Sequence, residues 1–81
     1  MNTWLKLKDG IECIGLKVRD SPSGLAVLLK IEELDQQKVE PPVEKWIPIS
    51  QILVGVYNSH TKEYRIMLPS WLANKLAEEI L

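Results

Sequence analysis

The segment that most constrains the fold is residues 45–52, Lys-Trp-Ile-Pro-Ile-Ser-Gln-Ile, in which an apolar strand stops abruptly. Trp46 and the isoleucines beside it favour an extended, packed backbone, so we expect Trp46 to belong to the core. Pro48 cannot donate to a central ladder and marks an edge, a bulge or a strand end. Ser50 can accept a hydrogen bond from a later backbone N–H, which predicts a single helical turn over residues 50–53.

The chain is too short for more than one core. It has 81 residues, so we predict a single domain over residues 1–81. A domain of this size buries roughly 60–65% of its unfolded surface. Hydrophobic residues make up 46% of the sequence and charged residues 26%, which is typical of globular proteins and excludes a wholly disordered chain. Because phenylalanine is absent, leucine, isoleucine and valine must fill most of the core.

The cysteine content and the N-terminal residues indicate the cellular compartment. The single cysteine, Cys13, excludes an intramolecular disulfide and a cysteine-rich zinc site and favours a reducing environment. Its position on an apolar strand face predicts a buried structural thiol. Residues 1–8 alternate charged and apolar positions without the continuous apolar run of a signal peptide, and no run is long enough to span a bilayer. We therefore expect a cytoplasmic protein with no membrane partner.

Alternating apolar positions predict three strands in the first half of the chain, over residues 4–8, 11–19 and 25–34. The alternation slips within the second strand, which predicts a bulge between Cys13 and Gly15 that turns both apolar sets inward. A bulge also bends a strand, as the closure of a small barrel requires.

Acidic residues concentrate in residues 32–44, which carry five acids and one lysine. Most of this stretch, residues 35–44, is polar and contains Pro41-Pro42, so we expect a loop that is long for a compact domain. Such a loop is either used in binding or merely solubilising. The acids that we select as candidate protein-binding residues are Glu32, Glu33, Asp35, Glu40 and Glu44.

The second half of the chain predicts a hairpin from residues 53–57 and 64–68, then a C-terminal helix over residues 70–81. The helical period places five apolar residues on one face: Leu72, Ala73, Leu76, Ala77 and Ile80. Trp71 projects away from that face. The predicted fold class is α+β, a small bent antiparallel β-barrel or roll of about five strands within residues 3–68, closed by one helix.

Catalysis and a bound cofactor have no support in the sequence. The one histidine, His60, falls in the predicted hairpin turn and has no partner at a metal-ligand spacing, so no metal site is expected. The sequence contains neither a nucleophile motif nor a glycine-rich phosphate loop. We therefore predict a protein that is not an enzyme, with no cofactor and with His60 as a solvated turn residue.

Binding of single-stranded nucleic acid is one alternative function. Small barrels can present basic residues around stacking aromatics, and Tyr57 and Tyr64 flank the predicted hairpin with Lys62 and Arg65 nearby. Tyrosines on strands are also common as half-buried cover, and scattered basic residues as a solvated face. The sequence lacks the dense basic field of a protein held mainly by phosphate contacts.

Protein binding has the stronger support. Trp71 stands on the polar side of the predicted helix, and tryptophan is among the residues that dominate interface energies. The alternative is that Trp71 folds back over the sheet and holds the helix down. A third hypothesis is a structural subunit that forms a homo-oligomer through an open strand edge or the helix.

Two motifs resemble those of small phage-encoded accessory proteins. Residues 46–52 are close to a Trp-Ile-Pro-Lys-Ser-Gln-Ile strand end, and residues 68–73 are close to a Pro-x-Trp-Leu-Ala helix. The likeness covers residues 45–53 and 68–77. Ile49 stands where these proteins have lysine, which favours an apolar contact at that position over a basic role.

The resemblance implies a phage or prophage origin and a small barrel without catalytic residues. Small acidic phage proteins of this size also include inhibitors of host defence nucleases, among them anti-CRISPR proteins, an analogy that rests on size and charge. The leading hypothesis is a non-catalytic module that binds a host protein or nucleoprotein complex. By covering a functional surface, it would inhibit or modulate nucleic-acid processing or defence.

Overall fold

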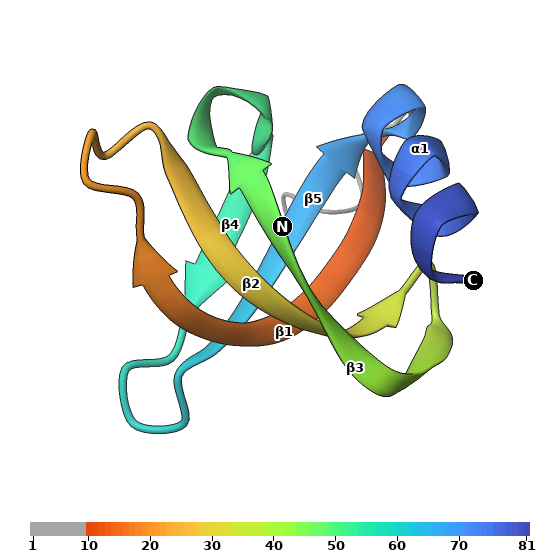
Figure 1. The fold of residues 1–81 in the computed structure, drawn as a ribbon, viewed down its shortest axis with the longest axis horizontal. Coiled ribbons are helices and arrows are strands. Elements are labelled where there is room, and N and C mark those ends of the chain that lie inside the picture. The colour runs from red at the N-terminus through yellow and green to blue at the C-terminus, as the bar shows by residue number, and fades with distance from the viewer. Residues whose placement is uncertain (1–9) are drawn as a thin grey trace, which may run out of the picture.

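The computed structural model describes residues 10–81 (Figure 1). In chain order, its elements are β1 (Gly10–Asp20), β2 (Ala26–Leu34), β3 (Gln37–Pro48), the 3-10 helix η2 (Ile49–Gln51), β4 (Val54–Tyr57), β5 (Glu63–Pro69) and α1 (Ser70–Ile80). The strand predicted over residues 4–8 lies outside the described residues. The predicted α+β class is confirmed, because five antiparallel strands form one sheet and a C-terminal helix follows them.

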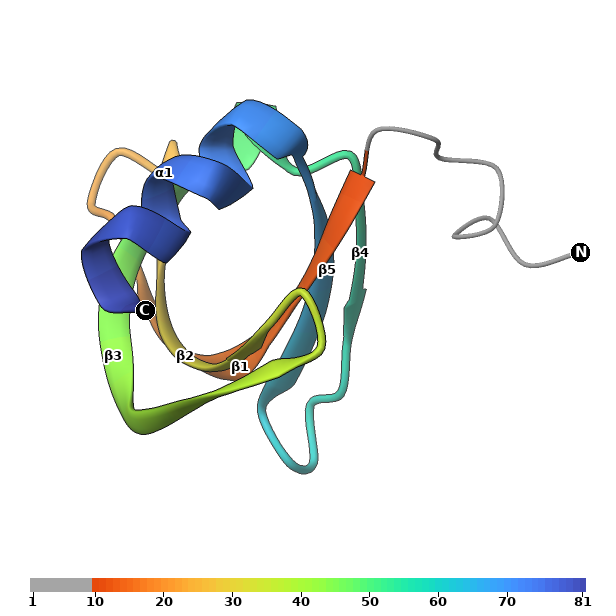
Figure 2. The same cartoon turned by 90° about the vertical axis from the view of Figure 1, so that its right-hand side faces the viewer.

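The sheet is open and strongly curved. Its strands run in the order β3-β2-β1-β5-β4, and each neighbouring pair is antiparallel. α1 lies across the concave side (Figure 2). There Lys45 of β3 reaches the helix, with its Nζ 3.4 Å from Glu79 Oε1. Within residues 10–81, β3 and β4 are the two edges of the sheet and do not pair with each other.

The concave side of the sheet and one face of α1 share a single apolar core. The buried members of this core cluster are Cys13, Val27, Leu29, Ile31, Leu34, Val39, Ile47, Ile66, Leu68, Leu72, Ala73 and Leu76. Ala77 and Ile80 pack at its border, so the helix face predicted from the sequence is confirmed. No helix in the described part of the chain combines the length and the apolarity needed to cross a membrane.

The bulge predicted in β1 is present as a register shift against β2 between Ile14 and Gly15. A Cβ at Gly15 would lie 2.9 Å from Leu29 Cγ and would also meet the backbone oxygen of Lys30, so glycine lets the two strands approach. The expectation that the bulge turns both apolar sets inward is wrong. Ile14 is buried outside the core cluster, and Val18 is exposed.

The prediction of an acidic loop over residues 32–44 is also wrong. β2 ends at Leu34, Asp35 and Gln36 form a two-residue turn, and β3 follows directly. The two turn residues have left-handed φ values of 51° and 65°, as a type I′ hairpin turn requires. β3 can hold its adjacent prolines because it is an edge strand, where a missing N–H need not interrupt a ladder.

The strand end predicted at Pro48 is confirmed, but the expectation that Trp46 packs in the core is wrong. Ile47 is fully buried, whereas Trp46 is 45% exposed, because successive strand residues face opposite sides of a sheet. A helical turn does form after the strand, but as η2 over Ile49–Gln51 and not over residues 50–53. Ser50 makes no capping hydrogen bond, so the turn forms without the side-chain contact that we expected.

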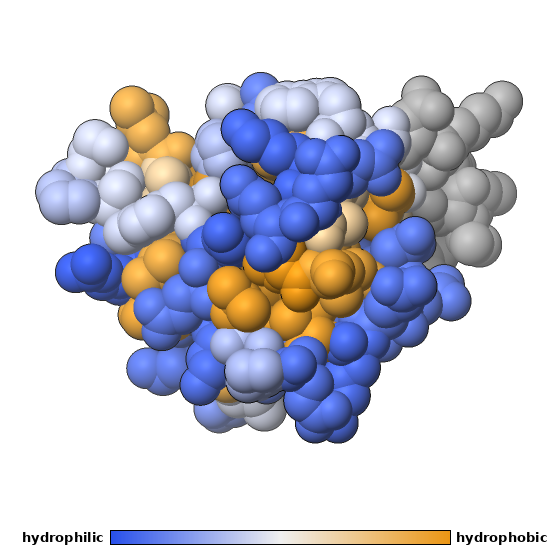
Figure 3. Space-filling model, turned by 45° about the vertical axis from the view of Figure 1, so that its right-hand side comes forward, coloured by the Kyte–Doolittle hydropathy of each residue, from blue (hydrophilic) through white to orange (hydrophobic). Residues whose placement is uncertain are grey.

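The core comes close to the surface between α1 and the β2–β3 turn. A hollow of about 100 Å³ at this place is lined on its apolar side by Ile11, Leu34, Ala73, Ala77 and Leu81. Figure 3 shows an apolar area framed by hydrophilic residues on this side of the molecule. The hollow is small and is lined by Leu34 and Ala73, two buried members of the core cluster.

Candidate functional site

The convex side of the sheet, which we call the outer face, carries the strand side chains that the core does not use. On β2, residues 27, 29 and 31 belong to the core cluster, so alternation directs Leu28 and Lys30 to the outer face. Cross-strand partners face the same side. The partners of these two residues are Arg19, Trp46, Leu16 and Glu44.

Arg19 and Trp46 form a stacked pair on the outer face. Arg19 Cζ lies 5.6 Å from the Trp46 ring centroid, within the range of a cation–π interaction. Leu28 stands between them on the middle strand and is buried although it points away from the core. The pair therefore covers an apolar floor while the tryptophan ring remains partly open to solvent.

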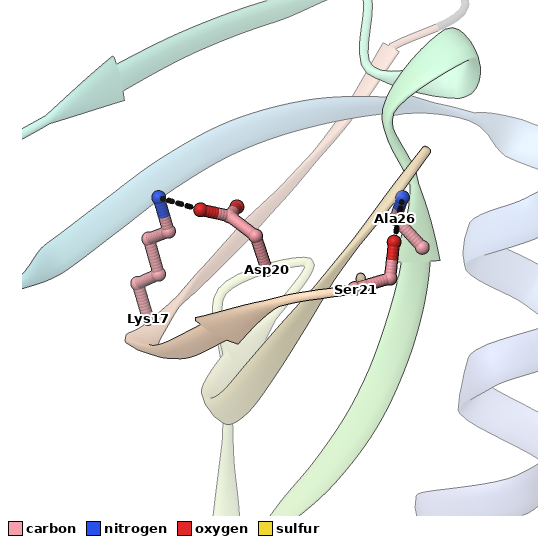
Figure 4. A network of polar contacts seen from close by, with 4 residues as sticks. All are labelled: Lys17, Asp20, Ser21 and Ala26. Atoms are coloured by element: carbon pink, nitrogen blue, oxygen red, sulfur yellow. Dashed lines mark hydrogen bonds and ion pairs between the residues drawn. The ribbon is translucent and has the colours of Figure 1, made fainter. Parts of the chain in front are cut away.

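The β1–β2 turn holds further apolar side chains at the same end of the sheet. Ser21 closes this turn, since its Oγ accepts a hydrogen bond from Ala26 N at 3.1 Å and its own N–H donates to the Ala26 carbonyl (Figure 4). Leu25, which is 73% exposed, is fixed beside Ile49, whose N–H donates to the Leu25 carbonyl at 3.0 Å. Leu25 and Ile49 are thus two exposed apolar residues joined by a backbone hydrogen bond where the β1–β2 turn meets η2.

An open groove of about 360 Å³ is the second feature of the outer face. Its lining residues are Ile14, Glu32, Glu33, Lys38, Glu63 and Arg65. Among residues 10–81, its three carboxylates form no ion pair, while Arg65 Nε lies 3.9 Å from Glu12 Oε2 just outside the lining. The groove has one more negative than positive side chain, so it can accept a cationic group.

The acids predicted to bind a partner do not form one loop. Glu32 and Glu33 line the groove, and Glu44 lies on the outer face as the partner of an exposed β2 lysine. Asp35 occupies the β2–β3 turn, and Glu40 is an exposed residue of β3. The outer face thus gathers part of the predicted set and separates the rest.

Trp71 stands apart from the outer face. It lies in the first turn of α1, which covers the concave side of the sheet, and its side chain is 58% exposed. The ring is not a member of the core cluster. Trp71 is therefore a second exposed tryptophan on a different surface from Trp46.

The residues predicted to bind nucleic acid are divided between the two sides of the sheet. Tyr57 and Tyr64 meet edge-on across β4 and β5, with ring centroids 5.7 Å apart, and Lys17 Nζ lies 5.3 Å from the Tyr57 ring. Arg65 follows Tyr64 in β5 and so faces the opposite side. Lys62 lies in the β4–β5 turn with a φ of 63°.

Cys13 and His60, the two reactive side chains singled out in the sequence, lie in different environments. Burial raises the pKa of the Cys13 thiol to about 12, and the charge of Glu12 adds to the rise, so this thiol is the buried structural group that the sequence predicted. His60 is exposed in the β4–β5 turn. In the part of the chain that the structure describes, no group of three or more His, Cys, Asp and Glu residues is placed to hold a metal ion.

Sequence reasoning missed the Arg19–Trp46 pair. The cluster of large apolar residues around Pro48 favoured a buried Trp46. The strict alternation of a strand offered a signal, because a buried Ile47 requires Trp46 to point the other way. Arg19 carried no local signal, since its contact with Trp46 depends on the strand order.

Comparison of the chain with protein-family models, with curated proteins and with solved structures finds no match.

Proposed function

We propose that this chain is a non-catalytic protein-binding module whose outer face contacts the partner. The observation that carries the proposal is the Arg19–Trp46 pair, a half-exposed aromatic ring held over an apolar floor. Tryptophan and arginine are the residue types most enriched at interface hot spots. A ring already held in place by Arg19 loses little conformational freedom on binding, which favours affinity.

The surroundings of the pair supply the other parts of an interface. Leu25 and Ile49 add apolar area that a partner can desolvate. The groove on the same face, with Glu32 and Glu33 in its lining, adds charges that fix the orientation of the partner. The partner that fits offers an apolar pocket to Trp46 and a basic side chain to the groove.

The motif resemblance to phage accessory proteins narrows the class of partner. It supports a host nucleic-acid-processing or defence complex, which the module would inhibit or modulate by covering a working surface. Basic protein surfaces are common in such complexes because they contact nucleic acid, and the carboxylates of the groove suit a surface of that charge.

Capture and affinity measurements test the proposal. The tagged full chain should retain a stoichiometric protein from nuclease-treated host lysate, and titration calorimetry with that purified protein gives the Kd. Trp46→Ala should raise this Kd by about 30-fold or more, as truncation of an interface hot spot does. The matched control is Trp71→Ala, which removes the same side chain from α1 and should leave the Kd unchanged.

An increase in Kd with Trp71→Ala alone would contradict the outer face and place the interface on α1. An unchanged Kd for both variants would show that neither tryptophan contacts the partner. Circular dichroism of the two variants shows whether any loss of binding reflects unfolding.

Single-stranded nucleic acid is the second candidate ligand, and the position of Lys17 over the Tyr57 ring favours it. A cation beside an exposed aromatic ring suits a stacked base and its phosphate. If this function is the right one, the untreated lysate yields nucleic acid and nuclease treatment removes it. The retained amount would then fall steeply with salt concentration.

A further inference from the structure

The two edges of the sheet differ in how well they are protected. Within residues 10–81, β3 is a twelve-residue edge that contains three prolines and four charged residues: Pro41, Pro42, Pro48, Lys38, Glu40, Glu44 and Lys45. β4 is the short edge Val-Gly-Val-Tyr, without a proline or a charge. Prolines, charges and a very short strand are common means of keeping an edge from pairing with another chain. β4 is short but has neither a proline nor a charge.

Hydrogen bonding between β4 and β5 leaves alternate residues of β4 unpaired. At one end of this ladder, the Asn58 N–H donates to the Glu63 carbonyl at 2.9 Å. Bonded and non-bonded pairs alternate in an antiparallel ladder, so Val56 also bonds to β5 in the observed register. Gly55 and Tyr57 therefore direct their N–H and C=O groups toward the open edge.

We infer that a second copy of this chain adds to the β4 edge, antiparallel and about a two-fold axis at Val56. In this register, Gly55 of one copy and Tyr57 of the other exchange both backbone hydrogen bonds, and symmetry repeats the exchange. The two Val56 residues stand opposite each other as a non-hydrogen-bonded pair, where side chains come closest. This inference goes beyond the proposed function, because it needs no host partner.

The side chains of β4 are complementary to themselves in this register. Tyr57, the largest residue of the strand, comes opposite Gly55, which has no side chain. The Tyr64 ring lies against Gly55, with its Cε1 only 2.9 Å from where a Cβ would be, so the incoming tyrosine meets an aromatic surface. Val56 is 57% exposed, and pairing covers it in both copies. No charged residue of β4 faces its symmetry mate.

Sedimentation equilibrium of the full chain over a range of concentrations tests the inference, and the wild type is expected to dimerise. Val56→Lys and Val56→Glu each place like charges at the closest approach of the two copies. Either substitution should raise the dimer dissociation constant at least about 100-fold. An equimolar mixture of the two variants should associate again, because residue 56 meets its own mate, so each mixed dimer has one attractive Lys–Glu pair in place of a repulsive pair.

Val18→Lys introduces the same charge at an exposed valine of β1, away from the β4 edge, and should leave the dissociation constant unchanged. A wild-type chain that remains monomeric at the highest concentration overturns the inference. A dimer that persists in Val56→Lys, or variants that fail to associate when mixed, overturn it as well. Amide exchange at Gly55 and Tyr57 that is slow at every concentration would also overturn it, since the edge would then be covered by something other than a second copy.

Discussion

Cys13 makes the stability of the protein depend on pH. Burial, with a smaller effect of Glu12, raises the pKa of its thiol from an ordinary 9.0 to about 12. Above pH 9 the unfolded chain therefore loses a proton that the folded chain keeps, which favours unfolding. Stability from this group is complete below pH 9 and is lost as the pH rises toward 12, by up to about 1.4 kcal/mol per pH unit.

Urea denaturation of the wild type and of Cys13→Ala at several pH values above 9 checks this prediction. The alanine variant leaves a small cavity and should be less stable below pH 9, but its free energy of unfolding should fall less steeply above pH 9, so the difference between the two proteins should shrink as the pH rises. The comparison isolates Cys13 because every other side chain is the same in the two proteins. Equal slopes in the two proteins would show that the thiol does not titrate differently in the folded and unfolded chains.

The turn of the β2–β3 hairpin holds two non-glycine residues in the left-handed backbone region, which is unfavourable for them. Asp35 and Gln36 both adopt left-handed φ values, and glycine is the residue that such a turn prefers at its second position. Gln36→Gly should therefore raise the free energy of unfolding by about 0.5–1 kcal/mol, even though glycine also loosens the unfolded chain. Thermal denaturation followed by circular dichroism measures the change.

Gln37→Gly provides the matched control for the hairpin. It removes the same side chain one residue later, within β3, where no left-handed backbone is needed. This variant should lower the free energy of unfolding by about 0.5–1 kcal/mol. A loss of stability in Gln36→Gly of similar size would contradict the account of the turn.

The elements differ in how far the sequence could predict them. The helical period of α1 and the apolar alternation of β2 were enough to predict these two elements, because each pattern is local and each element packs one face against the core. β3 was not predictable in the same way, since adjacent prolines and the lack of an Asx-Gly pair suggested a loop. An edge strand tolerates prolines, and that position follows only from the strand order. The Arg19–Trp46 contact depends on the same strand order. The sequence therefore predicted neither this contact nor β3.

The whole molecule depends on one core that the sheet and α1 build together. Leu76 of α1 is buried in the same cluster as Ile66 and Leu68 of β5, so the helix is a wall of the core. A chain of 81 residues has roughly 4–12 kcal/mol of stability in total. Leu76→Ala should remove about 2–4 kcal/mol of it, which is a large share.

The loss in Leu76→Ala should appear in a single cooperative transition, because neither the sheet nor the helix can bury its apolar face without the other. Far-ultraviolet circular dichroism, which reports on α1, and tryptophan fluorescence, which includes Trp46 on the sheet, should give coincident denaturation curves. Lys75→Ala changes the neighbouring exposed residue and should leave stability within about 0.5 kcal/mol of the wild type. If the helical signal disappeared at lower denaturant than the fluorescence change, the sheet would hold a core of its own and α1 would be an accessory element.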